Sequence, residues 1–399
     1  MAQTADLDIR DQWQDQPTSR PEHGQAGRTA GDVAYSLMQN HRGSGSGRGG
    51  ALRRQPTGGR KAAEMSHSAE TSNTDDFQRL ADPFRRELLA HCYRMLGSVH
   101  DAEDLVQETY LRAWKAFERF EGRSSLRTWL YSIATRACLT ALEQRNRRPM
   151  PSDFGGPSND PQGTLPERPE VPWLEPIPDA LAGGDPNDPA AIVTSRESLR
   201  LALVAALQHL PPRQRTVLLL RDVLKWRAAE VAELLETSTA SVNSALQRAR
   251  AQLDEVAPSE DDVVEPADPD QRMLLDRYVT AFHNADVPAI VELFKEDAVW
   301  EMPPILAWFS GRDDIGRVIA FQCAPERGEL RLVPTMANGQ PAFGVYRRGA
   351  DGLHHAFQIQ VLTVGPAGIT HVGAFFDTTL FATFGLPDVH PAPSQPLQR

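Results

Sequence analysis

The segment that most constrains this chain runs from Phe84 to Arg148, and its centre is the run 101–115. Placed on a helix, the apolar residues of this run form one stripe and its charged and amide residues lie on the opposite face. The stripe is Ala102, Leu105, Val106, Thr109 and Ala113, and the polar face is Asp101, Glu103, Asp104, Gln107, Glu108 and Arg112. The pattern predicts an amphipathic helix, and taken alone it is most simply explained as a helix with one solvated face.

A loop and an aromatic-rich helix come after this run. The sequence Gly-Arg-Ser-Ser at 122–125 interrupts the helical pattern. Apolar periodicity then resumes from Arg127, includes Trp129 and Tyr131, and ends in a cluster of arginines at 145–148. With the apolar stripe of 84–96 before them, these segments predict a small helical bundle over residues 76–148.

These segments together resemble region two of the bacterial sigma-seventy factors, in the extracytoplasmic-function group. In that family the acidic helix docks on the coiled coil of the polymerase beta-prime subunit, and the loop and next helix hold flipped bases of the melted minus-ten strand. The resemblance implies polymerase contacts at Asp101, Glu103, Asp104, Gln107, Glu108 and Arg112. It implies minus-ten DNA contacts at Arg123, Ser124, Ser125, Arg127, Trp129, Tyr131 and Arg136.

The residue types at these positions suit that role. Loop hydroxyl groups can bind an extruded base, aromatic rings stack on unpaired bases, and arginines hold phosphates. For Trp129 and Tyr131, ordinary packing inside the bundle is an equal alternative. Arg136 departs from the family pattern, which often has Asn there, so the base preference at that position stays open.

A second helical block is predicted over residues 189–256. Asp188 is a good N-cap followed by Pro189 at the first helical position. Later in the block, helical patterns at 228–236 and 240–253 are joined by a short turn at 237–239, and the second begins with small polar residues. This is the helix-turn-helix pattern, although a helical hairpin with no DNA role fits the same pattern.

The wording of this block resembles sigma region four, which reads the minus-thirty-five element in the major groove and docks on the flap of the polymerase beta subunit. Asn and Gln pair with adenine and Arg with guanine. The implied base contacts are Ser241, Asn243, Ser244, Gln247 and Arg248, with Ala240, Val242, Ala245, Leu246 and Ala249 in the core. Two alternatives stay open for Arg213, Arg215 and Arg250: they contact DNA phosphates, or they are solvated surface residues with no DNA role.

The segment between the blocks, 149–188, is acidic and rich in proline, so an extended or irregular linker is expected. One apolar island, Val-Pro-Trp-Leu-Glu-Pro at 171–176, interrupts it. Relatives with a C-terminal extension carry a similar motif, so Trp173 and Leu174 are predicted to dock on the C-terminal domain or on polymerase. An inert spacer is the alternative.

Residues 265–390 have a different hydrophobic pattern, in which helical periodicity comes first and alternating, strand-like runs follow. An α+β cone is expected. The sequence Ala-Val-Trp-Glu-Met-Pro-Pro at 298–304 and the closing run 371–377 resemble the SnoaL-like family. Such cones often enclose a pocket, which here could be lined by Trp300, Glu301, Trp308, His355, His371 and Asp377. Catalysis as a cyclase or isomerase, ligand sensing and purely protein–protein regulation all stay open for this domain.

Charge and cysteine content narrow the alternatives. The net charge is −11, but 76–148 carries +3 and 194–255 carries +2, whereas 149–193 carries −7 and 256–399 carries −9. Such modest basic blocks predict weak DNA binding by the chain alone, which argues against a one-component repressor. The cysteines, Cys92, Cys138 and Cys323, lack the spacing of a zinc site or a disulfide framework. No membrane span or signal peptide is indicated, so a cytoplasmic protein is expected.

The first 75 residues are rich in Gly, Gln, Ser, Thr and Arg, with a Gly-Ser-rich centre at 43–50. Their small apolar content predicts disorder. The composition changes near Met65, which motivates the hypothesis that translation starts there.

The expected fold is thus multidomain, with two all-α sigma modules followed by a SnoaL-like cone, as in the sigma-G type of actinobacterial factor and its neighbour sigma-J. The resemblance implies a sigma factor that is not an enzyme, needs no cofactor or metal, binds core RNA polymerase and promoter DNA, and is modulated by its C-terminal domain. The alternative is a SnoaL-like small-ligand enzyme or sensor fused to a DNA-binding module.

Overall fold

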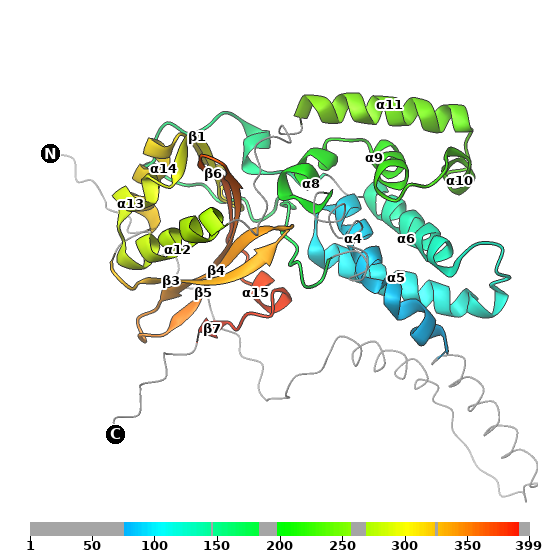
Figure 1. Ribbon diagram of the computed structural model, residues 1–399, viewed down its shortest axis with the longest axis horizontal. Coiled ribbons are helices and arrows are strands. Elements are labelled where there is room, and N and C mark those ends of the chain that lie inside the picture. The colour runs from blue at the N-terminus through cyan, green and yellow to red at the C-terminus, as the bar shows by residue number, and fades with distance from the viewer. Residues whose placement is uncertain (1–75, 145–146, 183–197, 257–268, 324–325, 391–399) are drawn as a thin grey trace, which may run out of the picture. The chain divides into compact units, whose positions relative to one another are not determined.

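Figure 1 shows the computed structural model, which describes residues 76–144, 147–182, 198–256, 269–323 and 326–390. The disorder expected for residues 1–75, the start at Met65 and the helix expected from Pro189 all fall outside these residues. The side chain of Cys323 is outside them too.

The first module is a bundle of α4, α5 and α6, as the periodicity predicts. Gly97 closes α4 in the left-handed region, at φ 71°, which a glycine adopts without strain. Ser98 then caps α5, because its hydroxyl accepts a hydrogen bond from the Asp101 amide at 3.1 Å. The elements are η1 (Asp82–Phe84), α4 (Arg85–Leu96), α5 (Val99–Ala116), η2 (Phe117–Arg119) and α6 (Leu126–Glu143).

The second module contains the predicted helix-turn-helix, formed by α10 and α11. The Ser238 hydroxyl accepts a hydrogen bond from the Ser241 amide at 3.1 Å at the start of α11. Val242, Leu246 and Ala249 are buried as predicted. Ala240 is exposed because it lies on the same side of α11 as the exposed Asn243, Ser244 and Gln247. The elements are α8 (Leu201–Gln208), α9 (Pro212–Leu218), the π-helical turn η4 (Leu219–Val223), α10 (Ala228–Leu234) and α11 (Thr239–Val256).

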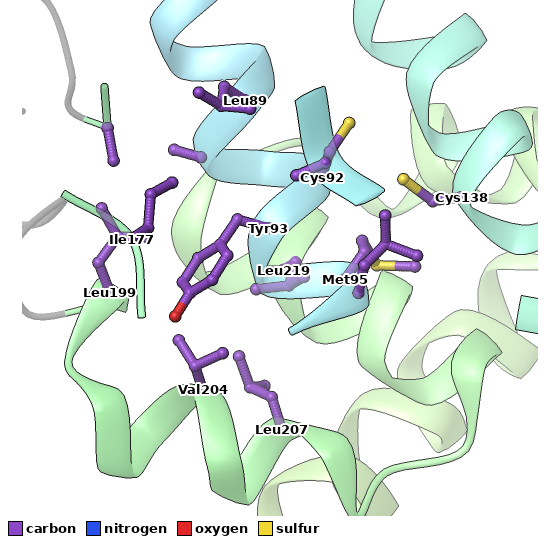
Figure 2. Close-up of a cluster of buried hydrophobic side chains, with 14 of the residues drawn as sticks. Leu89, Cys92, Tyr93, Met95, Cys138, Ile177, Leu199, Val204, Leu207 and Leu219 are labelled. Atoms are coloured by element: carbon purple, nitrogen blue, oxygen red, sulfur yellow. The ribbon is translucent and has the colours of Figure 1, made fainter. Parts of the chain in front are cut away.

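The two helical modules share one hydrophobic core. Figure 2 shows Tyr93 of α4 beside Ile177 of the linker and Leu199, above Val204 and Leu207 of α8. All five side chains are buried. The linker and the second module therefore complete a core that α4 begins.

The C-terminal domain is a curved sheet with helices on one face. Its strand order is β2-β1-β6-β5-β4-β3, with β7 paired to β5; β1 and β6 are parallel and the other pairs antiparallel. The strands are β1 (Phe294–Glu301), β2 (Trp308–Ser310), β3 (Leu330–Ala337), β4 (Gln340–Arg348), β5 (His354–Gly365), β6 (Gly368–Phe375) and β7 (Val389–His390). The helices are α12 (Pro269–Asn284), α13 (Val287–Val291), α14 (Arg312–Val318), η6 (Ile319–Cys323) and α15 (Leu380–Thr383).

The two faces of this sheet belong to different cores, because alternate residues of a strand point to opposite sides. On one face, Trp300 and Val372 pack with the helices of the domain's own layer, which Figure 1 shows as α12, α13 and α14. On the other face, Tyr346, Val361 and Phe375 join the core of the helical modules. The outer face of the sheet is therefore buried against the sigma modules.

The described part of the linker, residues 149–182, is irregular as expected, apart from the turn η3 (Pro151–Phe154). It lies along the C-terminal domain through two isolated bridges, Glu167 with Ile305 and Pro178 with Ala337. At the turn between β3 and β4, the Asn338 side chain accepts a hydrogen bond from the Ile177 amide at 3.0 Å. The linker thus runs between the first module and the C-terminal sheet.

Candidate polymerase, promoter and linker surfaces

From Asp104 to Arg112, the polar face of α5 is directed to solvent. Asp104 and Gln107 are exposed, and Glu108 pairs with Arg112 at 2.5 Å one turn later. Leu111 lies on the same face and is 41% exposed. Its spacing of three from Glu108 and four from Gln107 could have identified it, since those residues are neighbours on a helix surface. The face combines acidic groups with one apolar side chain.

The beginning of α5 is less accessible. Asp101 pairs with Arg148 at 2.5 Å, and the two side chains are only 16% and 15% exposed. Glu103 is half-buried. The expected polymerase contact by Asp101 is thus not available in this conformation, because the end of the first module folds back over it.

A pocket of about 330 Å³ lies where α5, the loop after it and α6 meet. Trp129 lines it together with Phe120, and the two rings lie 4.8 Å apart between centroids. Arg123 and Ser124 from the loop also line it. Three predicted DNA residues therefore converge on one aromatic pocket, and Phe120 is a lining residue that the sequence pattern did not reveal.

Three of the other four predicted minus-ten residues make contacts within the first module or with the second. Ser125 caps α6 through the Thr128 amide at 3.0 Å. Arg127 makes a bidentate pair with Glu87, with nitrogen–oxygen distances of 2.9 and 2.7 Å. The ring of Tyr131 is 1% exposed and packs edge-on against Trp226, so it cannot stack on a base in this conformation. Arg136 is exposed on α6.

The predicted reading face of α11 is exposed along its length. The residues with exposed side chains are Ser241, Asn243, Ser244, Gln247 and Arg248. They occupy the side of the helix opposite to the buried Val242, Leu246 and Ala249. This arrangement leaves amide, hydroxyl and guanidinium groups free to enter a groove.

The three candidate phosphate contacts differ in their surroundings. Arg213 is exposed, and Arg250 makes a bidentate pair with Asp222 at 2.9 and 2.6 Å. Arg215 is buried and donates to the carbonyls of Met95, Gln208 and Leu210. Burial lowers the pKa of Arg215 to about 10. Arg215 therefore joins the two helical modules here and does not face solvent.

Glu175 is the centre of the linker's polar contacts. Its carboxylate accepts from the Ser98 hydroxyl at 2.7 Å and pairs with His100 at 3.0 Å and Arg148 at 3.3 Å. The neighbouring Leu174 is fully buried. Trp173 is 9% exposed and donates its indole N–H to the Arg168 carbonyl at 2.8 Å. The apolar island of the linker is thus packed and hydrogen-bonded.

The pKa of His100 is raised, mainly by its hydrogen bond to Glu175, although partial burial opposes this shift. Burial alone would raise the pKa of Glu175, but the hydrogen bond from His100 and the charge of Arg148 lower it. A raised histidine pKa stabilises the folded state with the linker docked. This contribution is complete below about pH 6.5, the ordinary pKa of histidine, and is lost as the pH rises through the raised pKa. A lowered Glu pKa adds stability above about pH 4.3, lost on further acidification.

We therefore expect linker docking to weaken as the pH rises from 6 to 9. Thermolysin cleavage on the amino side of Leu174, which is buried while the linker is docked, measures this when it is compared with the His100→Gln variant at each pH. The wild-type chain should become relatively more susceptible with rising pH, since His100 loses its proton. An unchanged ratio between the two proteins across this range would rule out a role of His100 in docking.

The six residues expected to line a pocket of the cone do not meet in one place. Trp300 and Glu301 are consecutive in β1, so they lie on opposite faces of the sheet. His371 pairs with Glu301 at 2.8 Å on the outer face. His355 pairs with Asp351 at 2.8 Å at an exposed hairpin. Trp308 donates to the Gly155 carbonyl at 2.9 Å, and Asp377 lies at the junction with the linker.

Glu301 is a linker contact. Its carboxylate accepts a hydrogen bond from the Ser152 amide at 2.9 Å. Burial would raise the pKa of Glu301, but the hydrogen bond from His371 and the contact with Ser152 lower it. A buried, ionised and fully paired carboxylate of this kind anchors a segment more readily than it transfers protons.

Comparison with known families agrees with this architecture. Residues 80–148 match the family Sigma-70 region 2, residues 200–253 match Sigma-70 region 4, and residues 275–375 match the SnoaL-like domain. The ECF RNA polymerase sigma factor SigG of Mycobacterium tuberculosis is 56% identical over 338 residues, which cover 82% of this chain and 90% of that protein. This chain belongs to the ECF family of RNA polymerase sigma factors. The predicted fold class and the prediction of a sigma factor are thereby confirmed.

Two further comparisons concern SigJ, an ECF sigma factor of Mycobacterium tuberculosis. Its sequence is 29% identical over 251 residues, covering 60% of this chain and 70% of SigJ. Its crystal structure covers 79% of this chain and all of that chain, at 25% identity and a TM-score of 0.49.

A sigma factor directs a polymerase that performs the chemistry, so this chain is not an enzyme. Among the described helices, none is long and apolar enough to cross a membrane.

Proposed function

We propose that this sigma factor binds the coiled coil of the beta-prime subunit through the polar face of α5 and the beta flap through its second module. It reads the minus-ten strand with the α5–α6 loop and the minus-thirty-five element with α11. Promoter recognition takes place in the cytoplasm, where polymerase and promoter DNA are found. The proposed modules are 76–148 and 189–256, joined by the linker 149–188, and the C-terminal domain 265–390 modulates them.

The observation that carries this proposal is the division of α5 into two faces. Ala102, Val106, Thr109 and Ala113 are buried, whereas Asp104, Gln107, Leu111 and Arg112 face solvent. Acidic and apolar groups side by side on a rigid helix suit a protein partner with a basic groove. The same helix also positions the aromatic pocket beside which a melted strand would pass.

The modulating role of the C-terminal domain is supported by its contacts. Tyr346, Val361 and Phe375 of the sheet belong to the core of the sigma modules. Thr383 of α15 contacts His100 at 3.3 Å, beside the start of α5. A domain packed against the proposed polymerase-binding helix can bias its availability. His355 lies apart from the paired Glu301 and His371, and Glu301 is already bound by the Ser152 amide of the linker, which favours this role over catalysis.

The test is run-off transcription with core polymerase from a related bacterium on genomic promoter fragments. The full chain should bind core polymerase in size-exclusion chromatography and produce transcripts from a subset of fragments. Core polymerase alone is the control for promoter-independent synthesis. A chain that is folded by circular dichroism but neither binds core polymerase nor starts transcripts would contradict the proposal.

The aromatic pocket yields a prediction of its own. Replacing Trp129 with Ala removes a stacking surface, which is worth about 1–3 kcal/mol per base. Binding of a single-stranded minus-ten oligonucleotide by the holoenzyme should fall about tenfold, as measured by fluorescence anisotropy. The matched control is Phe321→Ala, which removes an aromatic ring that is 59% exposed in the C-terminal domain. Equal affinities of the two variants would show that Trp129 only packs.

A further inference from the structure

A second cavity, of about 420 Å³, lies at the seam between the linker and the C-terminal domain. Trp173 and Leu174 form its linker side. Phe375, Phe376 and Leu380 form its opposite side. Its volume is within the usual range of small-molecule sites, about 300–1,000 Å³. It is separate from the cone interior, where Trp300 packs in the domain's own core.

The charged side chains at this cavity differ in how many hydrogen-bond and ion-pair partners they already have. Arg148 donates hydrogen bonds to the carboxylates of Asp101 and Glu175 and to the Trp173 carbonyl, at 2.5, 3.3 and 2.8 Å. Asp377 is exposed on the rim, and its Oδ1 atom accepts from the amide and hydroxyl of Thr379 at 2.9 and 2.6 Å. Its Oδ2 atom accepts no hydrogen bond from any residue that the structure describes. The group left to meet a ligand is therefore an anion beside aromatic walls.

We propose that this cavity binds a small aromatic monocation. Its ring packs among Trp173, Phe375 and Phe376, and its ammonium group lies against the Oδ2 atom of Asp377. Aromatic faces attract cations, which adds to the carboxylate contact. An anionic ligand is disfavoured because Arg148 already pairs with Asp101 and Glu175. Asp377 has no ion-pair partner within 4 Å among the described residues, although its charge also acts on the more distant His100. The C-terminal segment 256–399 carries a net charge of −9, which further attracts a cation.

Such a ligand would bind only when the linker is docked, because each side of the cavity comes from a different segment. A ligand that binds one state stabilises that state. The aromatic monocation would thus hold the linker on the C-terminal domain. This consequence for transcription rests on the proposed modulating function, whereas binding itself does not.

The test uses the full chain without polymerase and three probes of similar shape: 2-phenylethylamine, 2-phenylethanol and 3-phenylpropionate. Saturation-transfer NMR titrations measure their affinities. We expect the amine to bind about tenfold more tightly than the alcohol, and the acid not to bind. Equal binding of all three, or no binding of the amine up to its solubility limit, would overturn the proposal.

Asp377→Asn isolates the charge, because the amide oxygen can still accept both hydrogen bonds from Thr379. This variant should lose the tenfold preference for the amine while its affinity for the alcohol is unchanged. Asp351→Asn, at the exposed hairpin, is the matched control and should behave as the wild type. An amine preference that survives in Asp377→Asn would refute the assignment of the cation site.

Run-off transcription with and without the amine tests the regulatory consequence separately. A change in transcript yield is expected for the wild type and not for Asp377→Asn. If the amine binds but yield does not change, the regulatory consequence fails while the site stands. If the chain starts no transcripts at all, the proposed function fails, and the binding result remains readable.

Discussion

Replacing Asn338 with Ala should release the linker from the C-terminal domain. Asn338 is fully buried and accepts from the Ile177 amide at 3.0 Å. Its amide group donates to the Tyr93 hydroxyl at 2.8 Å and to the Leu199 carbonyl at 2.7 Å. Each buried polar group left without a partner costs about 1–3 kcal/mol, so the combined loss is about 3–5 kcal/mol. One side chain thus joins the first module, the linker and the start of the second.

Backbone strain adds to this effect, because Asn338 has φ 57°, which Asn tolerates better than Ala. The Asn338→Gly variant separates the two contributions, since it relieves the strain but removes the same hydrogen bonds. Hydrogen exchange at residues 171–179 measures linker release. Both variants should exchange much faster than the wild type, with Ala the faster. Wild-type protection in Asn338→Gly would show that these hydrogen bonds do not hold the linker.

The second large effect is expected from reversing two charges on α5. In Asp104→Arg with Glu108→Arg, the proposed partner surface meets like charges, and Arg112 loses its ion pair. Like-charge contacts across an interface cost several kcal/mol, so affinity for core polymerase should fall at least about 100-fold. Surface plasmon resonance on immobilised core polymerase, followed by run-off transcription, measures both binding and activity.

The matched control reverses two acids elsewhere, Glu296→Arg with Asp297→Arg. These side chains are 87% and 74% exposed in β1, and their ion pairs, at 3.8 and 3.6 Å, are long. The control changes the net charge of the chain by the same amount as the α5 variant. Equal losses in the two variants would mean that net charge, and not the α5 face, governs polymerase binding.

Local periodicity predicted the parts of this fold that depend on neighbouring residues. The buried stripe of Ala102, Val106 and Ala113 follows from helix geometry. The exposed face of α11 could be read in the same way. Strand alternation could also have warned that Trp300 and Glu301 cannot line one pocket, because they are adjacent in a strand.

The remaining features depend on packing between distant segments. Nothing near Tyr131 in the sequence shows that Trp226 covers it, nor that Arg215 reaches the Met95 carbonyl. Asn338 resembles any turn residue before Gly339, yet it is the buried junction of three segments. The seam cavity was missed for the same reason, since its two walls are far apart in the chain.

The shared core of the two helical modules limits how far apart on promoter DNA the two modules can bind. The centres of the minus-ten and minus-thirty-five elements are about 25 base pairs apart, or about 85 Å at 3.4 Å per base pair of B-form DNA. In this conformation Thr216 of α9 lies 3.6 Å from the sulfur of Met95 in α4. With the modules in contact, we expect the protein to engage one of the two proposed elements at a time, and engaging both would require the modules to separate. Separation would also return the guanidinium of Arg215 to water, where it becomes available to a DNA phosphate.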